Sequence, residues 1–211
     1  SHVHEWQMSA LSVMPVTITT ENSANIFSDF YSKFSHKSEK IFPGYHSLIL
    51  DRYQIKAELT STKRVGFHKY TFPLNTQKGI LLNLNTILGP CENTNGKLEK
   101  DNDYELSGSL VLSTNFRRPK PLTVYFKIKF NKPITSIERN SATGNYLVNF
   151  GKAKEKILMK AGISYTSIEN ATNNILQELP HWDFDKVVSD SKNEWNTLLG
   201  RIKIEGGTGT D

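Results

Sequence analysis

The first six residues of the chain carry the side chains that are best suited to chemistry. They read Ser1-His2-Val3-His4-Glu5-Trp6. In an extended segment His2 and His4 point to the same side, because side chains two positions apart share a face of a strand. Two histidines could begin a metal site, but no third ligand follows at a suitable spacing, and two ligands do not make a zinc site. In an ordinary strand or loop the same histidines need have no function at all.

A sugar-binding interpretation uses more of this segment. The hydroxyls of a pyranose need oriented hydrogen-bond partners, which imidazole and carboxylate groups supply, and the apolar face of the ring stacks on an indole. The candidate substrate-binding residues are therefore His2, His4, Glu5 and Trp6.

Other polar side chains have simpler structural interpretations. Asp183 precedes an amphipathic stretch and is expected to cap a helix, and Glu58 is expected to pair with a basic neighbour. His36 and Glu39 lie in a turn-like stretch, and His68 is expected to be a half-buried, hydrogen-bonded strand residue. Hydrolysis of a glycoside needs two carboxyl groups at a defined separation, and no spacing here pairs any two. We therefore assign no catalytic residue and no metal ligand.

Composition narrows the class of protein. The chain has 211 residues, of which 37% are hydrophobic and 22% charged, enough for one substantial globular domain with an appendage. The net charge of +5 is spread along the chain, so nucleic-acid binding is not expected. No apolar run approaches the roughly 20 residues that span a bilayer, and no signal peptide is recognised. Cys91 is the only cysteine, which excludes an intrachain disulfide. Because the chain begins at Ser1, we expect a processed, engineered or excised segment.

Residues 1–165 have the pattern of a large antiparallel β-sandwich. Apolar and polar residues alternate with period two over 104–112, 122–130 and 157–165, with shorter runs at 55–59, 82–85 and 146–150. Turn signals separate these runs at Pro43-Gly44, Gly89-Pro90, Asn95-Gly96 and Thr143-Gly144-Asn145. The alternation slips at Gly66, which indicates either a β-bulge or a strand that is covered on both faces.

Residues 166–211 have a helical pattern instead. Thr166 and Glu169 form a capping-box pair before a first helix, which Pro180 ends. Asp183 begins a second helix that Gly200 ends. A short strand is predicted at 201–205. The apolar stripe of the second helix consists of Phe184, Val187, Val188, Trp195, Leu198 and Leu199. Two amphipathic helices after an all-β body need a surface to cover them, so we expect a connector to a further domain.

Several ordered motifs resemble those of glycoside hydrolase family 92. They cover most of the chain and read Ser1-His2-Val3-His4-Glu5-Trp6, Leu11-Ser12-Val13-Met14-Pro15, Phe34-Ser35-His36-Lys37-Ser38-Glu39, Pro43-Gly44-Tyr45, Ala57-Glu58-Leu59-Thr60-Ser61-Thr62, Arg64-Val65-Gly66-Phe67-His68-Lys69-Tyr70-Thr71-Phe72-Pro73, Gly162-Ile163-Ser164-Tyr165-Thr166-Ser167, Asn173-Asn174, Glu178, Trp182-Asp183-Phe184-Asp185, Trp195-Asn196 and Leu199. Family members usually have a further strand upstream of Ser1 and small residues in place of Glu5-Trp6, so the resemblance is least complete at the N-terminus.

The resemblance implies a calcium-dependent, inverting exo-α-mannosidase, of α-1,2 type, that removes terminal mannose from glycans such as N-glycans. The β-sandwich would be joined by the helical linker 166–211 to an (α/α)6 barrel that holds the catalytic carboxylates and the calcium ligands after Asp211. His2, His4, Glu5 and Trp6 would contact the mannose-containing substrate. A periplasmic or cell-surface location is expected. The alternative is a stand-alone carbohydrate-binding β-sandwich without catalytic activity.

Overall fold

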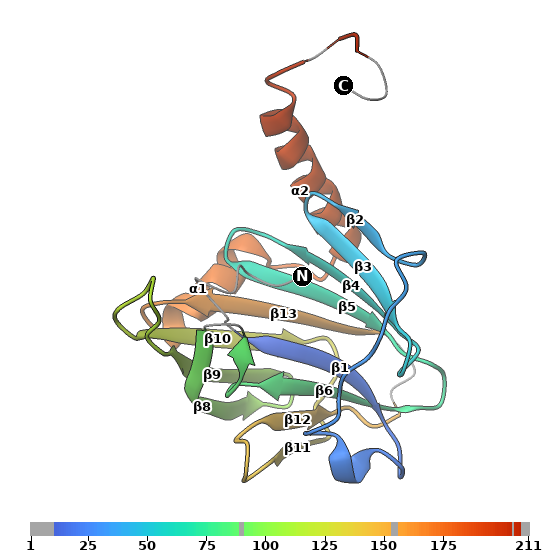
Figure 1. The fold of residues 1–211 in the computed structure, drawn as a ribbon, viewed down its shortest axis with the longest axis vertical. Coiled ribbons are helices and arrows are strands. Elements are labelled where there is room, and N and C mark those ends of the chain that lie inside the picture. Colours follow the sequence, from blue (N-terminus) through green and yellow to red (C-terminus); the bar gives the residue numbers. More distant parts are fainter. Residues whose placement is uncertain (1–10, 89–90, 153–155, 204, 208–211) are drawn as a thin grey trace.

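The computed structural model describes residues 11–88, 91–152, 156–203 and 205–207. Two antiparallel sheets face each other (Figure 1). The small sheet has the order β1 (Ser12–Ile18), β6 (Gln77–Asn83), β12 (Tyr146–Asn149), β11 (Ser136–Arg139). The large sheet has the order β2 (Lys40–Phe42), β3 (Tyr45–Leu50), β4 (Ile55–Ser61), β5 (Val65–Thr71), β13 (Ile157–Ser164), β10 (Leu122–Phe130), β9 (Glu105–Leu112), β8 (Cys91–Asn102), β7 (Ile87–Leu88). The predicted antiparallel sandwich is confirmed.

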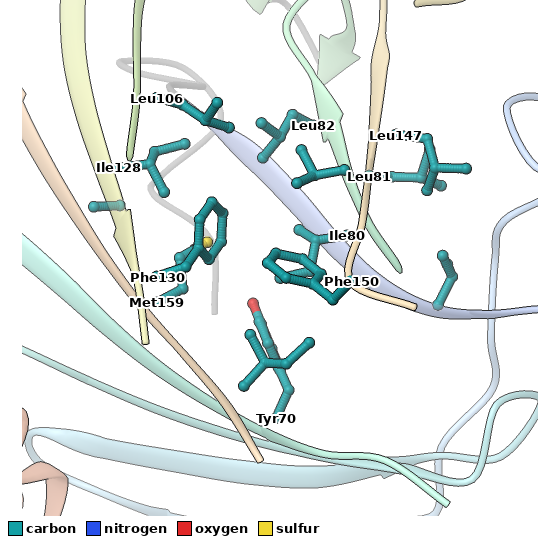
Figure 2. Packing of buried hydrophobic residues seen from close by; sticks show 14 of the residues in the cluster. Tyr70, Ile80, Leu81, Leu82, Leu106, Ile128, Phe130, Leu147, Phe150 and Met159 are labelled. Atoms are coloured by element: carbon teal, nitrogen blue, oxygen red, sulfur yellow. The ribbon is translucent and has the colours of Figure 1, made fainter. Parts of the chain in front are cut away.

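The core between the sheets is built from the apolar half of each alternating run. On β10 every second residue from Val124 to Phe130 is at most 2% exposed. Phe130 meets Phe150, which follows β12, edge to face at 4.9 Å between ring centres (Figure 2). Burial of each such side chain contributes about 1.5–3 kcal/mol. A 3-10 helix, η1 (Ser23–Asn25), lies in the connection from β1 to β2, and Ile26 after it is also buried in this core.

The irregular alternation around Gly66 results from burial on both faces. β5 pairs with β4 and β13 without a register shift, so it has no bulge. Val65 and Phe67 pack against the helices, whereas Tyr70 packs in the core between the sheets. Of the two interpretations of the sequence, the strand covered on both faces is therefore correct.

The predicted turn at Asn95-Gly96 is wrong. These residues lie inside β8, where the register with β9 shifts between Thr94 and Lys97. Asn95 adopts a positive φ of 53°. Some β-bulges place a residue at positive φ, as the hairpin turns favoured by Asn-Gly do, and Asn and Gly suit both. The signal at Gly89-Pro90 and the residues His2, His4, Glu5 and Trp6 lie outside the described part of the chain.

The first helix, α1 (Ile168–Glu178), lies on the outer face of the large sheet. Its cap is Ser167, whose side chain accepts from the Asn170 backbone N–H at 3.0 Å, and not Thr166 as the capping-box pattern predicted. The hydroxyl of Thr166 instead accepts from the Asn170 side-chain amide at 2.8 Å. Two adjacent hydroxyl residues offer the same spacing, and the backbone at Ser167, which is extended, decides between them.

The second helix, α2 (Phe184–Leu199), is capped by Asp183 and ends at Gly200, as predicted. Its first turns bury Phe184 and Val187 in a second cluster with Val65, Phe67, Ile175 and Leu179. Farther along, α2 projects away from both sheets (Figure 1). Its remaining stripe is exposed, at 46% for Trp195, 49% for Leu198 and 59% for Leu199.

The strand predicted at 201–205 does not form in the described residues of that segment, which are turn and coil. A strand needs a neighbouring edge to satisfy its backbone groups, and α2 has carried the chain away from the sheets by that point. None of the helices within the described ranges is long and apolar enough to cross a membrane.

Candidate functional site

Strands β3, β4 and β5 carry polar side chains on both faces, and the two faces have different surroundings. The outer face meets α1 and α2. The inner face is directed toward the small sheet and the core. The predicted substrate-binding residues lie outside the described part of the chain. The candidate functional groups of the described residues therefore lie on these two faces.

On the outer face Glu58 links the sheet to α2. Glu58 is 7% exposed, and its carboxylate accepts from the Tyr45 hydroxyl at 3.0 Å and lies 3.2 Å from the Lys56 ammonium and 3.3 Å from that of Lys69. Burial raises the pKa of Glu58, but the Tyr45 hydroxyl and the two lysines outweigh it and lower the pKa overall. The expected pairing of Glu58 with a basic neighbour is confirmed.

Lys69 continues this link into the helix. Its ammonium lies 4.3 Å from the centre of the Phe184 ring and 3.3 Å from the Asp185 carboxylate. Phe184 and Asp185 are the first two residues of α2. The network from Glu58 through Lys69 therefore fixes the start of α2 on the sheet.

Lys160 holds the corner between the two helices. It is 2% exposed, donates to the Leu179 carbonyl at 2.9 Å, and lies 4.0 Å from the centre of the Trp182 ring. Burial, assisted by the positive charge of Lys129, lowers the pKa of Lys160 to about 8. Lys129 and Lys160 both line a cleft of about 530 Å³ beside Trp182. The ammonium of Lys160 satisfies a carbonyl at the end of α1. The polar groups of the outer face therefore attach the two helices to the large sheet.

The inner face has a polar area at one end, which we name the inner-face shelf and which consists of His46, Leu59, Ser61, Gly66 and His68. Leu59 pairs with His46 on one side and with His68 on the other, so the three side chains form one row across β3, β4 and β5. The next residue in the row, Met159, is fully buried, whereas every shelf residue is half-buried or exposed. Figure 1 shows that β2 and β3 form the edge of the large sheet that lies away from β11 and β12 of the small sheet.

His68 is the most constrained side chain of the shelf. Its Nδ1 lies 2.6 Å from the hydroxyl of Tyr70, whose ring is buried in the core (Figure 2). Burial lowers the pKa of His68 to about 4, so the ring is neutral at physiological pH. Burial also raises the pKa of Tyr70 far above its usual value, so this hydroxyl keeps its proton. The expectation of a half-buried, hydrogen-bonded histidine is confirmed.

A carboxylate between two imidazoles lies at the other end of the shelf. Glu39, just before β2, lies 2.6 Å from Nδ1 of His36 and 2.8 Å from Nε2 of His46. The hydrogen bonds to His36 and His46 lower the pKa of Glu39. His36 itself is exposed. The sequence placed His36 and Glu39 in one turn, and the structure adds His46 as their partner.

The shelf combines groups that bind neutral polar ligands. It offers the imidazole of His68, a serine hydroxyl and an apolar leucine, which together suit a hydroxyl-bearing molecule. Both oxygens of its neighbouring carboxylate, Glu39, are already engaged. In the part of the chain that the structure describes, no group of three or more His, Cys, Asp or Glu residues is placed to hold a metal ion. Sequence reasoning missed this row because it depends on which strands pair.

Two family models match the chain. The one described as the glycosyl hydrolase family 92 N-terminal domain matches residues 1–164, and the glycosyl hydrolase family 92 catalytic domain matches residues 170–211. A curated relative from Arthroderma benhamiae, an uncharacterized secreted glycosidase, is 22% identical in an alignment that covers 82% of this chain and 26% of the relative.

Solved structures share the fold. The family GH92 alpha-mannosidase BT3965 from Bacteroides thetaiotaomicron is 22% identical, with a TM-score of 0.77 over 95% of this chain and 30% of that one. The family GH92 inverting mannosidase BT2199 from Bacteroides thetaiotaomicron VPI-5482 is 21% identical, with a TM-score of 0.75 over 94% of this chain and 27% of that one. The chain thus spans 26–30% of the length of these three proteins. Because the N-terminal domain model covers residues 1–164 of 211, the chain belongs to glycoside hydrolase family 92.

Proposed function

We propose that this chain is the N-terminal part of an inverting, calcium-dependent exo-α-mannosidase of α-1,2 type that releases terminal mannose from glycans such as N-glycans. The observation that carries the proposal is the order of the two family matches, N-terminal domain and then catalytic domain, along one chain. The names of the solved structures, an α-mannosidase and an inverting mannosidase, supply the substrate class and the stereochemistry.

In this proposal the β-sandwich supports a C-terminal (α/α)6 barrel and forms one wall of the substrate pocket. The exposed stripe of α2 supports such a partner, because Trp195, Leu198 and Leu199 are at least 46% exposed on a helix that leaves the sheets. Residues 166–211 would be the connection to the barrel, and His2, His4, Glu5 and Trp6 would contact the sugar. The proposed location is periplasmic or at the cell surface, in keeping with a relative named as secreted.

The chemistry of inversion would be carried out after Asp211. One carboxylic acid protonates the leaving oxygen while a second carboxylate, about 6.5–9.5 Å away, activates water on the opposite face of the sugar. Calcium prefers six to eight oxygen ligands, and the described residues do not fit such a site, since they hold no suitable acidic cluster. Its ligands are therefore proposed in the C-terminal part.

The full-length protein tests this proposal. It should hydrolyse 4-nitrophenyl α-mannoside and an α-1,2-linked mannobiose, release β-mannose first as followed by proton NMR, and lose activity in EDTA until calcium is restored. Residues 1–211 alone should be inactive. A full-length protein that binds mannosides but never cleaves them would favour the alternative, a carbohydrate-binding β-sandwich.

The pocket assignment is tested by replacing His4 or Trp6 with alanine in the full-length enzyme. We expect a lower kcat/KM with an unchanged melting temperature, because a lost sugar contact weakens binding of the transition state without disturbing the core. Unchanged kcat and KM in both variants would remove these residues from the pocket.

A further inference from the structure

His68 is held in one tautomer by its neighbour. The hydroxyl of Tyr70 lies 2.6 Å from Nδ1 of His68, and among the described residues it has no other hydrogen-bond partner. A buried hydroxyl that leaves its proton unsatisfied costs free energy. The favoured arrangement therefore has Tyr70 donating to Nδ1, which leaves the ring proton on Nε2. His68 thus presents a neutral N–H donor.

Nε2 of His68 lies over Gly66 on the inner face of the sheet. A Cβ atom built on Gly66 would lie 3.2 Å from Nε2 of His68, so the ring nitrogen stands directly above this glycine. The described part of the chain offers Nε2 no acceptor. Gly66 has no side chain to cover the donor, and Leu59 beside the ring supplies an apolar wall.

A neutral Nε2–H donor limits the class of ligand that His68 can bind. With Nδ1 occupied as an acceptor and Nε2 protonated, the ring cannot coordinate a cation, and its neutrality gives no special attraction to an anion. A neutral hydroxyl oxygen is the matching acceptor. We propose, resting on the proposed mannosidase function, that His68, oriented by Tyr70, is a substrate-positioning residue whose Nε2–H donates to one hydroxyl oxygen of the mannoside.

Two changes in the full-length enzyme probe the donor differently. His68→Leu removes it, whereas Gly66→Ala keeps it and crowds it with a methyl group at 3.2 Å. Because one such hydrogen bond corresponds to about a tenfold effect, both variants should lower kcat/KM on 4-nitrophenyl α-mannoside by about tenfold. His68→Gln, whose side-chain amide can still donate, should recover part of the loss. His181→Leu is the matched control, because this histidine lies on the outer face beside Asp183.

Deoxy substrates decide between a sugar contact and a merely structural role. Each enzyme is assayed on the 2-, 3-, 4- and 6-deoxy mannosides. The proposal requires one deoxy substrate on which His68→Leu and wild type have equal kcat/KM, because the hydroxyl that would accept the bond is absent. An equal fractional loss on every substrate, or no loss on any, would overturn it. An inactive wild type would instead refute the mannosidase function, and the assignment with it. Melting curves identify a variant that has not folded, and Gly66→Ala then serves in place of His68→Leu.

Discussion

Replacing Gly44 with alanine should loosen the attachment of α2 to the sheet. Gly44 lies in the turn between β2 and β3 with φ at +84°, a conformation that residues with a Cβ rarely adopt. A Cβ there would lie 2.1 Å from Oγ and 2.8 Å from Cβ of Ser191 on α2. The serine hydroxyl can rotate away, but its Cβ is fixed to the helix backbone. The turn and the helix must therefore separate.

Two costs add in this variant. The left-handed backbone of alanine costs about 1–2 kcal/mol, and overpacking costs about 1–3 kcal/mol. We expect the opening free energy of α2 to fall by about 2–5 kcal/mol. Since 1.4 kcal/mol is a factor of ten, backbone amides near the start of α2 should exchange at least about 25 times faster. Hydrogen exchange followed by mass spectrometry on the full-length protein measures this for peptides within 184–199.

Two further variants separate the costs. Gly206→Ala is the control for backbone strain alone, because Gly206 has φ at +91° and no atom within 4 Å of its ideal Cβ. Ser191→Gly, introduced together with Gly44→Ala, removes the clash and should recover the overpacking part. Exchange of α2 in Gly44→Ala within threefold of wild type would show that the helix does not depend on this contact.

Two pH profiles test the charges on the outer face. The folded-state pKa of Glu58 is below its usual 4.5. Its stabilising contribution is therefore present above that pH and is lost as the pH falls below it. The melting temperature of wild type should fall more steeply between about pH 5 and pH 3 than that of Glu58→Gln. For Lys160 the folded-state pKa is about 8 against 10.5, so between these values the unfolded chain binds more protons and the contribution of this residue rises with pH. Lys160→Met should lack this rise, and parallel profiles for wild type and variant would contradict the assignment.

The strands could be predicted because their alternation is a local property. The run from Leu122 to Phe130 became β10 over the same residues, since period-two alternation is sufficient to place one face in a core. The ends of elements were harder where neighbours share a chemistry, as at Thr166 and Ser167. Asn95-Gly96 shows the same ambiguity, because this bulge and an Asn-Gly hairpin turn both place a residue at positive φ.

The shelf could not be predicted, because it depends on pairing between distant segments. His46 and His68 are 22 positions apart in the sequence, and they share a row only because β4 lies between their strands with Leu59 opposite both. A histidine in a strand indicates at most a half-buried polar residue. Its orientation, its partner Tyr70 and the position of its Nε2 over Gly66 follow from the register of β5 with its neighbours.

Apolar side chains of α1 and of the first turns of α2 pack on the β-sandwich, whereas those at the end of α2 are exposed. The catalytic-domain match begins at residue 170, within α1, yet Ile175, Leu179, Phe184 and Val187 are at most 4% exposed because they cover Val65 and Phe67 of the sheet. Each of these buried side chains contributes about 1.5–3 kcal/mol, so the start of the matched catalytic region folds as part of the β-sandwich. The exposed stripe near Leu199 remains for a partner. Because α2 is continuous between the two ends, one helix carries both the exposed stripe and the contacts with the turn at Gly44 and with Lys69 on the sheet.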